Sequence, residues 1–309
     1  MASTHNIEII PVGGRIGAEV RGVKLSADLP ADVKQTIYSA WLRHKVLFFR
    51  GQDHLDDASQ ETLTGLFGSD PVAHPTVPSR EGTSFITELD SKYGGRANSW
   101  HTDVTFVDAY PKASILRALV VPPAGGDTTW ANTATAYQDL TPELRALADQ
   151  LWALHTNDYD YIQNRETSEA ERQRYHEQFT STAYETEHPV VHVHPETGER
   201  HLLLGHFVKK ILGVPPADSA RIFQLLQDHV TRLENTVRWR WQPGDVAVWD
   251  NRATQHYAIN DYGDQHRVVR RVTVNGTAPV SIQGKQSQTK KVVPRVALSR
   301  GEAGSVARA

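Results

Sequence analysis

The segment WHTDVTF, residues 100–106, places His101 and Asp103 two positions apart in a run rich in strand-forming residues. Side chains two positions apart on a strand lie on the same face, so an imidazole and a carboxylate can bind one ion. The third ligand we expect is His256 in WDNRATQHY (residues 249–257), just after a buried strand. Two histidines and one carboxylate form the facial site of non-haem Fe(II) oxygenases. The spacing therefore permits an iron site.

Two other histidine patterns compete with this set. The HLD segment at residues 54–56 has the same spacing, but it lies in a polar stretch where helix capping explains Asp56 or Asp57 better. The HVH segment at residues 192–194 has strand spacing, but it runs into a hairpin turn, where we expect exposed imidazoles. On spacing alone, a structural role for His101, Asp103 and His256 is as well supported as metal binding.

Strand-like segments occupy both ends of the chain, and helical segments occupy its middle. This order predicts a mostly β protein with helical additions: a double-stranded β-helix (jelly roll) with a helical insertion at about residues 139–235. We expect residues 1–283 to form a single domain, followed by a basic C-terminal tail at 284–309. Strands are expected at 7–12, 16–20, 45–50, 99–107, 113–121, 190–194, 201–204, 236–241, 246–249 and 267–275, and helices from residue 30 to about 44 and at 57–67, 141–154, 168–179 and 216–233.

Composition excludes several classes of protein. The net charge of −3 divides into a basic tail, which we expect to be a solvated end, and an acidic body that does not suit nucleic-acid binding. Without cysteine there are no disulfides, thiolate metal sites or cysteine nucleophiles, so the 15 histidines and the carboxylates are the available metal ligands. The sequence has neither a signal peptide nor an apolar run of about 20 residues, so we expect a cytoplasmic protein that does not enter membranes.

A second group of residues supports a site for an anion. The segment HRVVRRVTV, residues 266–274, reads as a strand with Arg267 and Arg271 on one face. An inward-facing arginine in a β core is unfavourable unless it meets an anion, and its planar fork suits carboxylate or sulfo groups. The alternative is an internal salt bridge to an aspartate or glutamate.

Three stretches together resemble a known family: WHTDVTF, GGDT at residues 125–128, and WDNRATQHY with the later HRVVRR. They are similar to the taurine dioxygenase/TfdA family of Fe(II)- and 2-oxoglutarate-dependent dioxygenases, from about Ile7 to about Pro279. Within that family the chain looks most like the alkylsulfatases, which are sulfate-ester dioxygenases. The closer match lies in VAHPTVP, RANSWHTDVTF, YPKASILR, LWALHTNDYDY, ETEHPVV and LGHFVK.

The resemblance implies roles for individual residues. His101, Asp103 and His256 match the iron ligands of the family. Thr128, in the GGDT segment, and Arg267 match the residues that hold the distal carboxylate of 2-oxoglutarate, so the implied cofactors are Fe(II), 2-oxoglutarate and O₂.

The resemblance also implies a binding site for a small anionic substrate. Arg271 matches an arginine shared between the co-substrate and the sulfo group, and His74 and Val104 match substrate contacts. Taurine dioxygenases carry an asparagine four residues before the first iron ligand, near the substrate amine, whereas this chain has Ala97. That departure disfavours taurine and is neutral for an uncharged alkyl chain.

The implied reaction hydroxylates the carbon that bears the sulfate of a medium-chain alkyl sulfate, and it yields an aldehyde, inorganic sulfate, succinate and CO₂. A taurine or other alkylsulfonate dioxygenase that releases sulfite, or an aryloxyalkanoate dioxygenase, is the alternative within the family. The alternatives outside the family are a redox-silent, cupin-like metal enzyme and a non-catalytic binding module. We expect a homo-oligomer, either a dimer or a tetramer.

Overall fold

Two facing β-sheets form the centre of the computed structural model, which describes residues 7–68, 70–92, 97–158 and 177–294. The larger of the two sheets has eight strands. Its strands are β1 (Glu8–Pro11), β2 (Ala18–Arg21), β3 (Val46–Phe49), β4 (Pro71–Val72), β5 (Thr87–Asp90), β6 (Ala113–Val120), β14 (Val246–Asp250) and β16 (Val268–Val274). The order is β1-β2-β3-β14-β6-β16-β4, with β5 also paired to β16. Only the β2–β3 pairing in this sheet is parallel among the described residues.

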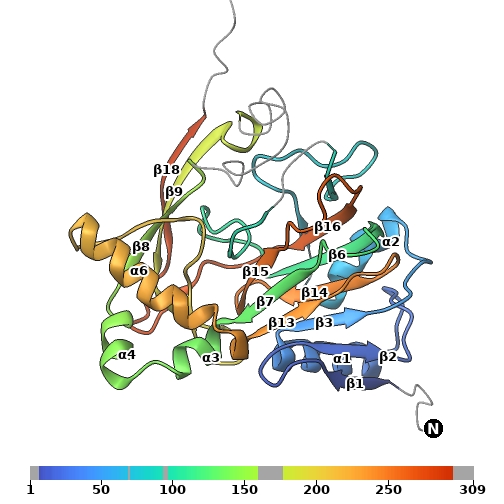
Figure 1. Ribbon diagram of the computed structural model, residues 1–309, viewed down its shortest axis with the longest axis horizontal. Helices are drawn as coiled ribbons and strands as arrows, with labels where there is room; N and C mark the ends of the chain where they lie inside the picture. The colour runs from blue at the N-terminus through green and yellow to red at the C-terminus, as the bar shows by residue number, and fades with distance from the viewer. Residues whose placement is uncertain (1–6, 69, 93–96, 159–176, 295–309) are drawn as a thin grey trace, which may run out of the picture.

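The smaller sheet contains β7 (Thr128–Asn132), β13 (Thr236–Trp239) and β15 (Thr254–Ala258), in the order β13-β7-β15. Inward-facing aromatic side chains fill the space between the two sheets. Phe48 stacks on Trp239 with 4.1 Å between ring centroids, and Trp130 lies 5.7 Å from Trp249. This mostly β, jelly-roll arrangement confirms the predicted fold class (Figure 1).

Helices cover the other face of the larger sheet. Helix α1 (Ala31–His44) buries the apolar stripe that its sequence predicts, and α2 (Asp57–Thr62) continues into the 3₁₀ turn η1 (Leu63–Leu66). The side chain of Asp56 accepts a hydrogen bond from the Ser59 backbone N–H, so the predicted capping role of this aspartate is confirmed.

A second group of elements lies beside the jelly roll, with α3 (Thr133–Gln138), α4 (Pro142–Ala148) and α6 (Pro216–Val230) on the side opposite α1 and α2 (Figure 1). It includes the 3₁₀ turn η3 (Leu233–Asn235). Its four-stranded sheet has the order β12-β8-β9-β18, from β8 (Trp152–Thr156), β9 (Thr182–Pro189), β12 (Val208–Ile211) and β18 (Gln288–Pro294). A three-stranded sheet, β11-β10-β17, contains β10 (Val191–Val193), β11 (Arg200–Leu202) and β17 (Val280–Ser281).

These elements correct the predicted insertion and tail. Residues 139–235 contain α4 and α6, the hairpin strands β10 and β11 at their predicted places, and also β8, β9 and β12, which were not predicted. The helix expected at 141–154 ends at Ala148, because the chain then extends to pair with β9. The helix expected at 168–179 falls mostly outside the described residues. As far as Pro294 the tail forms strand β18, which pairs with β9, and six of the seven residues of this strand are exposed to solvent.

The strand predicted at residues 99–107 is also wrong. In this segment the structure has a single bridge, between His101 and His256, followed by a series of turns. Val104 adopts a left-handed φ of 63°, which is unusual for a β-branched residue and ends any extended run.

In the described part of the chain, no helix is long and apolar enough to span a membrane.

Candidate metal centre

The structure brings His101, Asp103 and His256 together in a buried cluster. His101 Nε2 lies 3.7 Å from Asp103 Oδ1, and His256 Nε2 lies 3.8 Å from the same oxygen. The three ligand atoms all lie within 4.8 Å of one another. Reciprocal backbone hydrogen bonds of 3.0 and 2.8 Å join His101 to His256, so the smaller sheet positions both imidazoles.

The protonation of these groups fits a divalent cation. His101 Nδ1 lies 2.7 Å from the Ser99 carbonyl oxygen, which can only accept, so Nδ1 carries the hydrogen and Nε2 presents its lone pair. Burial lowers the pKa of His101 to about 3 and that of His256 to about 4, so both rings are neutral. Two imidazole nitrogens and a carboxylate oxygen thus face one another, and the donor set suits Fe(II).

Asp103 is fixed by several partners. Ser114 Oγ donates to Asp103 Oδ2 at 2.8 Å, and Arg271 Nη1 donates to Oδ1 at 2.5 Å. Burial opposes the charge of this carboxylate, but the Arg271 guanidinium and the Ser114 hydroxyl hold its pKa well below the ordinary value. Because Ser114 occupies Oδ2, the oxygen that faces the imidazoles is Oδ1.

Asn251 is a residue of the site that the sequence reasoning missed. Its side-chain oxygen accepts from the Asp103 backbone N–H at 2.9 Å, and its nitrogen donates to the Asp103 carbonyl at 3.0 Å and the Pro111 carbonyl at 2.9 Å. It is completely buried in the turn between β14 and β15. The sequence feature that could have identified Asn251 is its position: it is a polar residue that follows a buried strand within the segment WDNRATQHY, which already contained His256.

Val104, the next residue after Asp103, is buried against Phe106, Phe179 and Phe207. Its positive φ is a strained conformation that costs roughly 1–3 kcal/mol and is maintained only where neighbouring contacts fix the backbone. The ring of Phe207 lies 6.3 Å from that of His101. An apolar surface therefore borders the metal ligands on this side.

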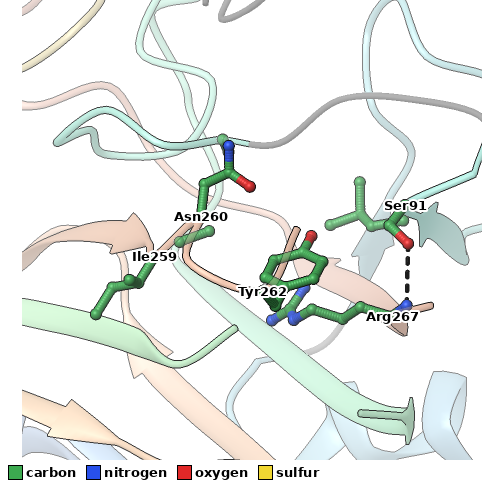
Figure 2. Close-up of a pocket in the computed structure, with 8 residues that line it drawn as sticks. Ser91, Ile259, Asn260, Tyr262 and Arg267 are labelled. Carbon is green, nitrogen blue, oxygen red and sulfur yellow. Dashed lines mark hydrogen bonds between the residues drawn. The ribbon is translucent and has the colours of Figure 1, made fainter. Parts of the chain in front are cut away.

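Arg267 lines a cavity of about 50 Å³, and Thr128 is the strand partner of Ala258, another residue of its lining. Ser91, Tyr262 and Arg267 line it, with the Tyr262 ring beside the Arg267 side chain (Figure 2). Arg267 Nε donates to the Gly126 carbonyl at 3.1 Å, which connects it to the strand that begins at Thr128. A Cβ at Gly126 would come within 3.1 Å of Arg267 Cδ, and the backbone there has a φ of 70°, so both the close approach and the conformation favour glycine.

Ala97 lines the same cavity as Arg267, together with Leu89, Ala258, Ile259 and Asn260. Ala97 itself offers no polar group, and the polar side chains of this cavity are those of Ser91, Asn260, Tyr262 and Arg267. The Thr128 hydroxyl accepts a hydrogen bond of 3.0 Å from Trp241 Nε1, which fixes its orientation.

His74 has a defined tautomer. Its Nδ1 accepts from the backbone N–H groups of Thr76 and Val77 at 3.2 and 2.9 Å, so the neutral ring carries its hydrogen on Nε2. Burial and the nearby charge of Arg271 lower the pKa of His74 far below its ordinary value. His74 therefore supplies a neutral N–H donor, and Arg271 supplies the positive charge.

The two competing histidine patterns lie elsewhere. His54 Nε2 lies 2.9 Å from the Leu25 carbonyl oxygen, away from the cluster. The prediction that His192 and His194 are exposed is wrong: their exposed fractions are 2% and 1%. The hairpin that carries them packs against the β14–β15 turn, where His192 contacts the Arg252 carbonyl and His194 contacts Asp250.

Comparisons with known proteins agree with this geometry. Residues 8–273 match the family described as taurine catabolism dioxygenase TauD, TfdA family. An alpha-ketoglutarate-dependent sulfate ester dioxygenase from Pseudomonas putida is 62% identical over 286 residues, covering 92% of this chain and 95% of that protein. An alkylsulfatase from Acinetobacter baylyi is 58% identical over 287 residues, covering 93% and 90%.

Solved structures agree as well. The crystal structure of a taurine dioxygenase from Burkholderia xenovorans superimposes with a TM-score of 0.78 at 38% identity. The match covers 92% of this chain and 95% of that one. The likeness therefore includes the elements on both sides of the buried cluster.

Proposed function

This chain belongs to the taurine catabolism dioxygenase TauD, TfdA family, and we propose that it is a 2-oxoglutarate-dependent dioxygenase of medium-chain alkyl sulfate esters. The observation that carries this proposal is the 62% identity to a sulfate ester dioxygenase in a chain that also holds a buried His-Asp-His cluster. The reaction converts the alkyl sulfate into an aldehyde and inorganic sulfate.

His101, Asp103 and His256 are the residues that would bind Fe(II). Bound iron, with 2-oxoglutarate and O₂, supplies the oxidising power that hydroxylates a C–H bond and converts the co-substrate into succinate and CO₂. Hydroxylation at the carbon next to the sulfate gives an ester that collapses to the aldehyde and releases sulfate. The protein therefore has to aim one carbon atom at the metal.

Arg271 and His74 are the proposed anchor for the sulfate. A sulfate monoester stays charged, and a fixed cation offsets the loss of its hydration. Arg271 Nη1 donates to Asp103 Oδ1, so its guanidinium lies beside the residues that would hold the metal. The Nε2–H of His74 adds a neutral hydrogen bond that fixes the direction of the ester.

Arg267 and Thr128 are the proposed partners of the distal carboxylate of 2-oxoglutarate. Arg267 is buried, and its guanidinium would form a charge-assisted pair with that group at the cavity beside Tyr262. Thr128 would contribute a hydroxyl from the first residue of β7.

The apolar side chains next to His74 suit an alkyl chain. Val104 would contact the substrate, and the rings of Phe106 and Phe179 lie 6.1 and 5.8 Å from that of His74. Apolar burial stabilises by about 0.8 kcal/mol per methylene, so affinity is expected to rise with chain length until the apolar surface is covered. Ala97 provides no partner for an ammonium group, which disfavours taurine.

A turnover assay with hexyl sulfate, butyl sulfate and taurine, which measures sulfate, sulfite and succinate, tests this proposal. We expect kcat/KM to fall in the order hexyl sulfate, butyl sulfate, taurine, with sulfate as the product. Arg271→Ala should raise the KM for hexyl sulfate more than that for 2-oxoglutarate. If taurine were the best substrate and sulfite the product, the sulfate-ester proposal would be wrong while the family assignment would stand.

Two further properties belong to this proposal. We place the reaction in the cytoplasm, and we expect the enzyme to be a dimer or a tetramer. Fractionation of the producing cells tests the first, and mass measurement of the purified protein in solution tests the second.

A further inference from the structure

The loop that carries Asp103 leaves the sheet directly after His101, and side chains hold it in place. Thr102 Oγ1 donates to the Thr254 carbonyl at 2.8 Å, and Asn251 holds the backbone of Asp103 from the jelly-roll side. The next residue, Val104, is strained at φ 63°. Whatever fixes the loop beyond Val104 therefore helps to set the position of Asp103.

Two hydrogen-bond relays fix that part of the loop from the opposite side. In the first, His188 Nε2 lies 2.7 Å from the Thr105 carbonyl, and His188 Nδ1 lies 2.7 Å from Ser287 Oγ. Because the carbonyl can only accept, Nε2 carries the hydrogen and Nδ1 accepts from the Ser287 hydroxyl. Burial lowers the pKa of His188 to about 4, which keeps the ring neutral as this relay requires.

The second relay runs parallel to the first. Thr186 Oγ1 donates to the Phe106 carbonyl at 2.6 Å and lies 3.0 Å from Thr289 Oγ1. Since the Thr186 hydrogen is used at the carbonyl, the Thr289 hydroxyl donates to Thr186. Thr289 Oγ1 also accepts from the Asp108 backbone N–H at 3.1 Å.

Strand geometry explains why the relays are parallel. Thr186 and His188 are two positions apart on β9, so they face the loop together. Thr289 of β18 pairs in register with Thr186, and Ser287 comes two positions earlier. The relays therefore start two residues apart at the C-terminal strand and end on the consecutive carbonyls of residues 105 and 106.

We propose that Ser287 and Thr289 are positioning residues for the metal centre, which act through His188 and Thr186 on the loop that carries Asp103. Both lie beyond residue 273, where the match to the family ends. The inference rests on the proposed metal site, and it adds the C-terminal strand to the structure that orients the ligands. Partners that orient metal ligands through outer contacts typically change metal affinity by about 10- to 100-fold when lost.

The test is the double variant Ser287→Ala/Thr289→Val, which removes both hydroxyls and keeps the branched shape at position 289. Gln288→Ala is the matched control, because Gln288 lies between them in the sequence and is exposed. Thr289→Ser, which retains the hydroxyl, is the rescue variant. The measurements are the Kd for Mn²⁺, backbone amide hydrogen exchange of residues 103–108, and Tm.

We expect the double variant to bind Mn²⁺ about tenfold more weakly and to exchange the loop amides faster, with Gln288→Ala and Thr289→Ser close to wild type. Unchanged Mn²⁺ affinity and unchanged loop exchange in the double variant would overturn the inference, as would an equal effect of Gln288→Ala. If the double variant does not fold, Ser287→Ala alone decides by the same two measurements. If wild-type protein does not bind Mn²⁺, the proposed metal site fails, and loop exchange still tests the relays.

Discussion

Two buried clusters in this protein contain the same residue types, and only one is arranged to bind a metal. At the metal centre, two imidazole nitrogens lie 3.7 and 3.8 Å from one carboxylate oxygen of Asp103, too far for hydrogen bonds. At the β14–β15 turn, His194 Nε2 lies 3.0 Å from Asp250, and Arg252 donates to both oxygens of that carboxylate at 2.9 and 2.7 Å. In the second cluster the imidazole bonds the carboxylate directly, whereas in the first both imidazole nitrogens face Asp103 Oδ1 beyond hydrogen-bond distance and Arg271 donates to that oxygen.

The largest expected effect separates the two clusters by function. His101→Ala, Asp103→Ala and His256→Ala should each abolish Mn²⁺ binding and 2-oxoglutarate-dependent succinate formation, because each removes one of three protein ligands. His192→Ala should lower Tm, because it unpairs a buried carbonyl, while metal binding persists. Equal loss of Mn²⁺ binding in His192→Ala and His101→Ala would contradict the assignment of metal binding to the first cluster alone.

The next effect concerns stability. Arg252→Ala should lower the free energy of unfolding by about 3–5 kcal/mol, because it leaves the buried carboxylate of Asp250 without its bidentate partner. Urea denaturation of the metal-free protein measures this loss. His54→Ala serves as a control, since His54 lies in neither cluster. A change below about 1 kcal/mol, the scale of an exposed ion pair, would show that the bonds between Arg252 and Asp250 do not stabilise the second cluster.

The smallest effects compare a charged with a neutral contact at the metal centre. Arg267→Ala should weaken 2-oxoglutarate binding by about 100-fold, or ~2.7 kcal/mol, as expected for loss of a charge-assisted pair in a buried site. Thr128→Ala removes one neutral hydrogen bond and should cost about 1 kcal/mol. Titration of 2-oxoglutarate into the anaerobic Fe(II) protein ranks the two. A larger effect at Thr128 would contradict the proposed roles.

The sequence predicted the jelly roll and selected the three residues that the structure brings together, His101, Asp103 and His256. The short motifs around them are visible within a few residues, but the strand on which His101 and Asp103 were expected to share a face does not form. The burial of His192 and His194 was not predictable in this way, because the partners that satisfy them, Asp250 and Arg252, lie more than 50 positions along the chain.

The loop after His101 was predicted wrongly for a similar reason. Its residues favour strands, but the backbone groups of residues 103, 105 and 106 bond to side chains of Asn251, His188 and Thr186 instead of to a neighbouring strand. Strand β9 was missed because its buried positions include the polar residues Thr186 and His188, which interrupt apolar alternation. Polar residues that bond across the fold carry no local signal.

The contact between Asp108 and Thr289 spans 181 positions of the chain, so it can form only near the end of synthesis. A chain emerging from the ribosome presents both histidines and Asp103 before it presents β18. Contacts between segments so distant in sequence form late, because a long loop must close first. A nascent chain that ends before Thr289 therefore has all three metal-binding side chains but lacks the final contacts of their loop, so the finished centre is a late product of synthesis.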